Sequence, residues 1–268
     1  MPRELETLLQ QSQVVDLSQP MSPAMPKFFA HIPFSLTLNL RHADLDIPGG
    51  VGMANDVIIG CTHSGTHIDA IGHISHNGCL FGGINAREAA SGIGGLLKCG
   101  IEQTPPILRR GVLLDVASFK DVDALEQSHV ITADCLEKTA KAEGVELRAG
   151  DVVLIRTGWA QYWDTPAKYE GMGVGGPGPD LSAAQWLVAH KASLTGADTM
   201  AYEFNTGDGG GAVHGYLLAD IGTQIIENLN LEGLAKERIY SFMFFAAPLR
   251  IVGATASPIR PVAICSQS

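Results

Sequence analysis

Cysteine is scarce in this 268-residue chain, and the cysteines present show no pairing pattern. There are five of them, an odd number, and none forms the C-x-x-C spacing of a redox or zinc motif. We therefore expect reduced thiols in a cytoplasmic protein. Two of them flank the histidine-rich stretch described below; we interpret them as small buried hydrophobic residues, with metal ligation as the alternative. The cysteines are Cys61, Cys79, Cys99, Cys135 and Cys265, of which Cys61 and Cys79 are the flanking pair.

Long apolar runs and positive charge are also lacking. No segment reaches the ~20 apolar residues needed to span a bilayer, and the N-terminal stretch has no hydrophobic signal-peptide region. The 18 basic and 28 acidic residues give a net charge of −10, which argues against nucleic acid or anionic membranes as partners. The composition fits one globular domain over residues 1–268. We expect a small-molecule substrate and a homo-oligomer, either a dimer or a tetramer.

Two common catalytic motifs are missing. The chain contains no G-x-S-x-G, which argues against a hydrolase with a nucleophilic serine. The glycine-rich residues 92–95 lack a following G-K-[ST] and a surrounding βαβ pattern, so they do not predict a phosphate-binding loop. Any catalytic residues are therefore expected outside these two motifs.

One short stretch, residues 61–83, is rich in residues that bind metals, and it reads CTHSGTHIDAIGHISHNGCLFGG. Imidazole and carboxylate groups are donors that Zn²⁺ and Mn²⁺ accept. The alternative is a set of ordinary polar loop residues, which would explain one histidine better than several on one face. We expect the last of the histidines to face solvent. The candidate donors are His63, His67, Asp69, His73 and His76.

The spacing of these donors favours an extended arrangement. In a helix, His63 and His67 would share a face, but Asp69 would point away from them. In a strand, all three would point the same way, because their separations are even. The preceding apolar residues 57–61 predict a buried strand, so we place the donors at its end and in the following loop. Gly65 would let a ligand approach the backbone closely.

Residues 63–73 resemble the H-x-G-T-H-x-D…H signature of the metal-dependent cyclase family, which includes bacterial kynurenine formamidases and isatin hydrolases. The resemblance extends through RTGW at 156–159, His214 with IIENL at 225–229, and APLRIVGATASPIRPVAI near the C-terminus. It covers nearly the whole chain and implies the swivelling β/β/α fold of the family. The alternation of several strands with few helices also indicates a single α/β domain with a mixed sheet.

The resemblance also implies roles for individual residues. Asp69 would bridge two metal sites, and His73 would be the general acid and base. Glu227 lies in an apolar run, where an unpaired charge is costly, so a metal, a protonated His214 or Arg156 is expected to neutralise it. A helix cap is the alternative for His214. The metal is expected to be Mn²⁺ or Zn²⁺, with one or two ions per subunit. The implied metal ligands are His63, His67, Asp69, His214 and Glu227.

Aromatic residues provide candidate walls for a substrate pocket. They are Phe28 and Phe29 in a proline-rich loop, and Trp159 and Trp163 after an apolar strand; packing in the core is the alternative for all four. Kynurenine formamidases carry a tryptophan-containing segment near the first pair, and this chain lacks it. Isatin-type ring opening to an aryl glyoxylate is therefore the leading activity, ahead of N-formylkynurenine (arylformamide) and lactone hydrolysis. A non-catalytic metal-binding structural protein is the competing class.

Local patterns predict several further elements. Thr132 has the position of a helix N-cap, and Ser182 with Gln185 resembles a capping box. The predicted elements are helices over 2–11, 132–143 and 182–191, a loop over 166–179, and a glycine-rich lid over 205–213.

Overall fold

The computed structural model describes residues 6, 10–45, 47–171, 175–204 and 211–266. Its main sheet consists of β1 (Ser12–Asp16), β4 (His67–Asp69), β7 (Ile107–Asp115), β9 (Val152–Arg156), β11 (Leu194–Ala197), β12 (Gln224–Glu227), β13 (Ser241–Ala246), β14 (Ala256–Pro258) and β15 (Val262–Ser266). The strand order is β1-β15-β13-β7-β9-β11-β12-β4-β14. The central strands β7, β9, β11 and β12 run parallel, and the other neighbours are antiparallel. The predicted α/β fold with a mixed sheet is confirmed.

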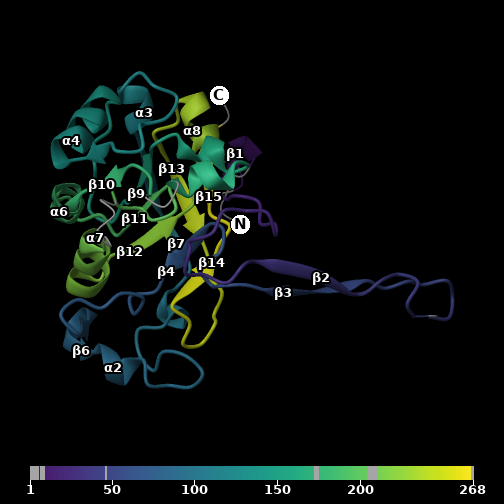
Figure 1. The fold of residues 1–268 in the computed structure, drawn as a ribbon. Coiled ribbons are helices and arrows are strands. Elements are labelled where there is room, and N and C mark those ends of the chain that lie inside the picture. The colour runs from purple at the N-terminus through teal and green to yellow at the C-terminus, as the bar shows by residue number, and fades with distance from the viewer. Residues whose placement is uncertain (1–5, 7–9, 46, 172–174, 205–210, 267–268) are drawn as a thin grey trace.

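Short helices surround this sheet, and α3, α4 and α6 lie together on one side of it (Figure 1). The helices are α2 (Ala86–Ala89), α3 (Val116–Phe119), α4 (Ala133–Ala142), α5 (Pro166–Tyr169), α6 (Leu181–Ala189), α7 (Ala212–His214), the π-helix η5 (Gly215–Ile221) and α8 (Glu232–Glu237). The 3₁₀ turns are η1 (Phe81–Gly83), η2 (Ile101–Gln103) and η3 (Trp159–Tyr162). Two small ladders pair β5 (Cys79–Leu80) with β6 (Ile84–Asn85), and β8 (Val130–Ile131) with β10 (Gly178–Pro179). None of the described helices has the length and apolar character that crossing a membrane requires.

Alternating side chains give the central strands two apolar faces. Val153 and Ile155 of β9 belong to the cluster that also contains residues of α4 and α6. Val152 and Leu154 point the other way, into a second cluster that includes Leu234 of α8. Because both faces are covered, the strand is a continuous apolar run. Each such side chain contributes roughly 1.5–3 kcal/mol on burial.

A two-stranded arm projects from the body of the molecule (Figure 1). It consists of β2 (Ser35–Leu40) and β3 (Asn55–Ile59), which pair antiparallel. Residues 57–59 form a strand, as predicted, but the predicted burial at 57–61 was wrong, because β3 pairs with β2 in the arm instead of joining the main sheet. All residues of β3 are exposed, and Ile58 retains 63% of its accessible surface.

Local signals placed some helix boundaries correctly and others not. Thr132 is the N-cap of α4, as predicted, and its hydroxyl accepts a hydrogen bond from the backbone of Cys135. The N-cap of α6 is Asp180 instead of Ser182, because the Asp180 carboxylate accepts hydrogen bonds from both Ala183 N–H and the Ser182 hydroxyl. The predicted loop over 166–179 contains α5, which begins at a proline that fits a first helical turn. The predicted helix over 2–11 and the lid over 205–213 fall mostly outside the described residues.

Candidate active site

The short strand β4 holds two of the candidate ligands at the centre of the site. His67 and Asp69 are two residues apart on it, so their side chains lie on the same side, as the even spacing predicted. Strand β12 places Glu227 directly opposite His67 in register. The turn before β4 contains Gly65 at φ +64°, and its carbonyl accepts a hydrogen bond from His67 Nδ1 at 2.9 Å. That bond fixes the tautomer and leaves His67 Nε2 free to act as a ligand.

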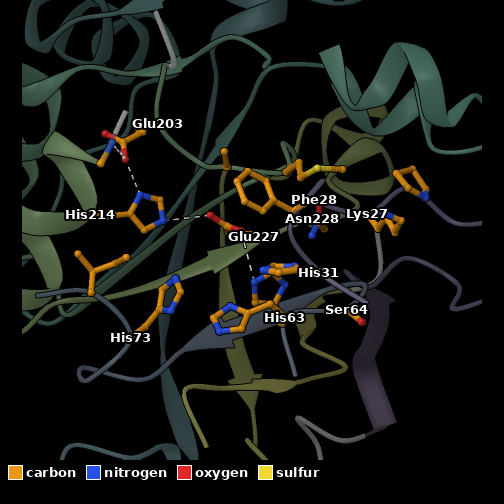
Figure 2. A pocket seen from close by; sticks show the side chains of 16 residues that line it. Lys27, Phe28, His31, His63, Ser64, His73, Glu203, His214, Glu227 and Asn228 are labelled. Atoms are coloured by element: carbon orange, nitrogen blue, oxygen red, sulfur yellow. Dashed lines mark hydrogen bonds and ion pairs between the residues drawn. The ribbon is translucent and has the colours of Figure 1, made fainter. Parts of the chain in front are cut away.

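The structure brings all five predicted metal ligands together. Figure 2 labels His63, His214 and Glu227 among them. Their donor atoms form two groups that share Asp69, and within each group the atoms lie within 4.8 Å of one another. Glu227 connects the groups, with its Oε2 3.3 Å from His67 Nε2 and its Oε1 3.1 Å from His214 Nε2. The groups are His63, His67 and Asp69, and Asp69, His214 and Glu227.

Unpartnered buried atoms show that this cluster fits a metal. His67 Nε2 and both carboxylate oxygens of Asp69 are buried and make no hydrogen bond to any described residue. His63 Nδ1 approaches Asp69 Oδ1 to 2.9 Å, but without hydrogen-bond geometry. A buried polar group without a partner costs about 1–3 kcal/mol. Nitrogen and oxygen donors in this combination suit Zn²⁺ or Mn²⁺, so a divalent cation at this position would satisfy all three atoms.

The electrostatic environment also favours a cation. Burial raises the pKa of Asp69, but the neighbouring His73, His63 and His67 outweigh burial and hold it below its ordinary value. Burial also raises the pKa of Glu227, but its hydrogen bond with His214 and the neighbouring His67 outweigh burial and lower it. Both carboxylates are therefore anionic at neutral pH, and they present negative charge to the centre of the site.

Glu203 is a site residue that the sequence did not single out from surface acids. It is only 6% exposed, and its Oε1 accepts a hydrogen bond from His214 Nδ1 at 2.6 Å. The same carboxylate accepts backbone N–H groups from Gly211 and Val213, at 3.0 and 2.7 Å. His214 is thus held with Nε2 toward Glu227, the arrangement typical of a metal-binding histidine. The sequence around Glu203 contains no motif that indicates this role, because a glycine-rich segment separates Glu203 from His214 in the chain.

His73 lies beside the two donor groups without belonging to either. Its ring centroid is 4.1 Å from that of His63 and 6.4 Å from that of His214. Burial is the main cause that lowers its pKa, to about 4, so the imidazole is neutral and able to accept a proton at pH 7. It lines a cavity of about 230 Å³ together with His63, His67, His214 and Glu227, so the ligands face an open space.

The structure separates the four predicted pocket aromatics. Phe28 lines the cavity, whereas Phe29 is 84% exposed and stacks on Phe28 at 4.5 Å between centroids. Trp159 and Trp163 do not line it; both are buried in an apolar cluster with Tyr169. Each indole N–H is already used, donating to the Leu125 carbonyl from Trp159 and to the Pro20 carbonyl from Trp163. The two tryptophans therefore pack in the core and do not form a wall of the cavity.

Other candidates lie away from the metal-type donors. Arg156 forms ion pairs with Asp115 and Glu232, both at 2.8 Å, so it neutralises structural acids and not Glu227. His76 is exposed, as expected, and pairs with Asp220 at 2.9 Å. The cysteines differ from expectation, because Cys61 is half-buried and Cys79 exposed, and neither belongs to a donor group among the described residues.

The chain resembles known proteins in both sequence and structure. Residues 15–203 match the family model described as "Putative cyclase", a range that contains His63, His67, Asp69 and His73 but ends before His214. The chain is 25% identical over 266 residues to isatin hydrolase of Roseibium aggregatum, covering 94% of this chain and 91% of that one. It superimposes on a crystal structure of a novel cyclase with a TM-score of 0.85 and 29% identity, covering 98% of this chain and 93% of that one. It superimposes on isatin hydrolase A from Ralstonia solanacearum with a TM-score of 0.77 and 22% identity, covering 99% of this chain and 98% of that one.

Proposed function

The chain belongs to the cyclase family of metal-dependent hydrolases, and from that premise we propose that it hydrolyses the C–N bond of a small cyclic amide. Isatin-type ring opening to an aryl glyoxylate is the leading reaction. The observation that supports a metal-dependent reaction is the set of unpartnered donor atoms on His67 and Asp69 beside a cavity that His73 also lines. The isatin hydrolase relative supports the choice of substrate class.

In this proposal the two donor groups around Asp69 hold one or two divalent ions, Mn²⁺ or Zn²⁺. Such an ion supplies Lewis-acid activation of water and of the scissile carbonyl. Gly65 and Glu203 orient His67 and His214 through their ring Nδ1 atoms, so both Nε2 atoms face the centre. The chain's contribution is therefore a preorganised set of ligands that needs no rearrangement when an ion binds.

His73 is the proposed general base and general acid. Its neutral ring accepts a proton from the attacking water while the carbon–oxygen bond forms. It then returns that proton to the leaving nitrogen as the carbon–nitrogen bond breaks, so the amide becomes a carboxylic acid and an amine. The acid then releases its own proton to solvent at neutral pH and becomes a carboxylate. Phe28 on the cavity wall offers an aromatic surface for the ring of the substrate.

The same arrangement suits two alternative substrates, an arylformamide such as N-formylkynurenine and a lactone, because each is opened by water attacking a polarised carbonyl. A metal-binding structural protein is the alternative from another class. The cavity beside the ligands and the extra base His73 disfavour it, because structural metal sites are usually closed to substrate.

The decisive experiment offers isatin, N-formylkynurenine and a dienelactone to the purified, metal-loaded protein and follows product absorbance. We expect isatin turnover that a chelator abolishes and that added Mn²⁺ or Zn²⁺ restores. If the protein hydrolyses N-formylkynurenine or the dienelactone but not isatin, that compound would replace isatin as the leading substrate. Turnover that survives complete metal removal would overturn the metal-dependent proposal.

A further inference from the structure

We propose that His31 binds the substrate, donating a hydrogen bond to a second carbonyl oxygen next to the scissile amide while Phe28 stacks on the planar ring. This inference rests on the proposed function and deepens it, because it names the residue that would select a cyclic α-keto amide. His31 belongs to none of the motifs that identify the metal site. It lies in the loop that leads into the β2–β3 arm.

The position of His31 is the first support. Its side chain lines the cavity beside the metal-type donors, and Figure 2 shows it between Phe28 and His63. The ring centroid is 5.2 Å from that of Phe28 and 5.4 Å from that of His63. The backbone N–H of His31 donates to the Phe28 carbonyl at 3.0 Å, so one turn sets both side chains relative to each other. A ligand beside the donor groups would therefore meet both rings.

The second support is that the His31 ring has no hydrogen-bond partner in the part of the chain that the structure describes. Two other polar side chains around the cavity are occupied: Asn228 donates to the Gly65 carbonyl and accepts from the Tyr169 hydroxyl, and Glu203 holds His214. The His31 ring makes no hydrogen bond to any described residue. A neutral imidazole carries one N–H donor and one acceptor. The ring thus presents an available donor within the cavity.

The shape and composition of the cavity point to the class of ligand. Its volume of about 230 Å³ suits a small molecule, and Phe28, Ile74, Met200 and Ala201 give it apolar walls. A planar ring would pack there, and one hydrogen bond from His31 would fix its orientation. Among the three proposed substrates, only the isatin type carries a second carbonyl adjacent to the scissile one. His31 would therefore discriminate through that oxygen, since a site built around a hydrogen bond disfavours analogues that lack the matching atom.

The test compares His31→Phe and His31→Asn in the full-length, metal-loaded protein. Phenylalanine keeps the aromatic ring but loses the donor, whereas asparagine keeps a donor. For isatin, we expect His31→Phe to lower kcat/KM about tenfold, mainly through KM, the scale of one lost hydrogen bond. His31→Asn should recover part of that loss. His190→Phe at the C-cap of α6, which removes a histidine that does not line the cavity, is the matched control and should leave the kinetics unchanged.

A binding measurement isolates the hydrogen bond itself. Oxindole has the ring of isatin without the second carbonyl, so its inhibition constant should be the same in wild type and His31→Phe. Equal losses for isatin and oxindole would overturn the inference, because they would indicate a packing role. An unchanged kcat/KM for isatin in His31→Phe, or loss of metal in that variant, would also overturn it.

Failure of this inference is distinguishable from failure of the proposed function. Wild-type turnover confined to N-formylkynurenine or the dienelactone would reject the α-keto amide selectivity of His31 and leave a metal-dependent hydrolase. Wild-type turnover of none of the three substrates, with metal bound, would reject the proposed substrates and this inference together. Isatin turnover with an insensitive His31→Phe rejects only the inference.

Discussion

Glu203 Oε1 accepts a 2.6 Å hydrogen bond from Nδ1 of His214, and the opposite ring nitrogen of His214 faces Glu227 at 3.1 Å. The carboxylate of Glu203 is itself held by two backbone N–H groups, so the imidazole has one preferred orientation. A carboxylate in this position increases the basicity of the ligand and reduces the entropy lost on metal binding. The orientation of His214 therefore depends on a residue that belongs to neither donor group.

Replacing Glu203 by alanine should weaken metal binding about 10- to 100-fold, the usual effect of losing such a support. Competition with a chromophoric chelator measures the affinity directly. Glu126→Ala, which removes an exposed acid, is the matched control and should bind metal as the wild type does. Wild-type affinity in Glu203→Ala would show that His214 is positioned by its backbone alone.

Asp69 should be the most sensitive ligand, because it belongs to both donor groups. Asp69→Asn keeps the size of the side chain but removes the charge, and we expect it to strip the protein of metal. His63→Ala, which disrupts one group only, should have a smaller or equal effect. Elemental analysis after gel filtration checks both variants. Stoichiometric metal in both would contradict the assignment of this site.

His73→Ala should separate catalysis from metal binding. The ring lies outside both donor groups, so metal content should stay at the wild-type level. The rate constant kcat should fall about 10²-fold or more, as expected when a general acid and base is lost. Steady-state kinetics with parallel metal analysis distinguishes the outcomes: an unchanged kcat removes His73 from the mechanism, and a loss of all metal makes it a ligand.

The sequence predicted those parts of the site that are local in the chain. His67 and Asp69 lie on one strand, so their even spacing was enough to place both side chains on one side. Glu203 and His31 reach the site through tertiary contacts, and neither carries a periodic or motif signal. The strand at 57–59 was predicted but its exposure was not, because an apolar strand has the same pattern whether it pairs inside a sheet or in a projecting hairpin.

Glu143 should make stability fall as pH rises. Burial and the nearby Asp115 carboxylate raise its pKa to about 8, against a hydrogen bond from the Asp115 backbone that favours the charged form. Its other oxygen is buried without a partner among the described residues. In the unfolded chain the carboxyl has its ordinary pKa of 4.5, so between pH 4.5 and 8 the folded state binds more protons and loses stability as pH increases.

Glu143→Gln should therefore raise Tm relative to wild type, by an amount that grows between about pH 5 and 8 and then levels off. Near pH 4 the two proteins should unfold at similar temperatures, because the glutamate is then neutral in both states. Thermal unfolding across this range measures the difference. Glu146→Gln, at an exposed acid three residues further on, is the control and should show no such trend. A constant offset at all pH values would contradict the shifted pKa.

Glu227 should determine whether the site holds one ion or two. Its two oxygens lie 3.3 Å from His67 Nε2 and 3.1 Å from His214 Nε2, so the carboxylate belongs to the second donor group and also approaches His67 of the first. A buried charge needs a positive partner, and in this site a second metal, or a proton on His214, is available to Glu227. We expect the metal, because Asp69, His214 and Glu227 form a complete set of donors that converge within 4.8 Å.

Glu227→Gln should then halve the metal content and reduce kcat while the protein stays folded by circular dichroism. If instead the proton is the partner, the same variant will keep the wild-type metal content and change only the temperature of unfolding, which would reduce the site to a single ion.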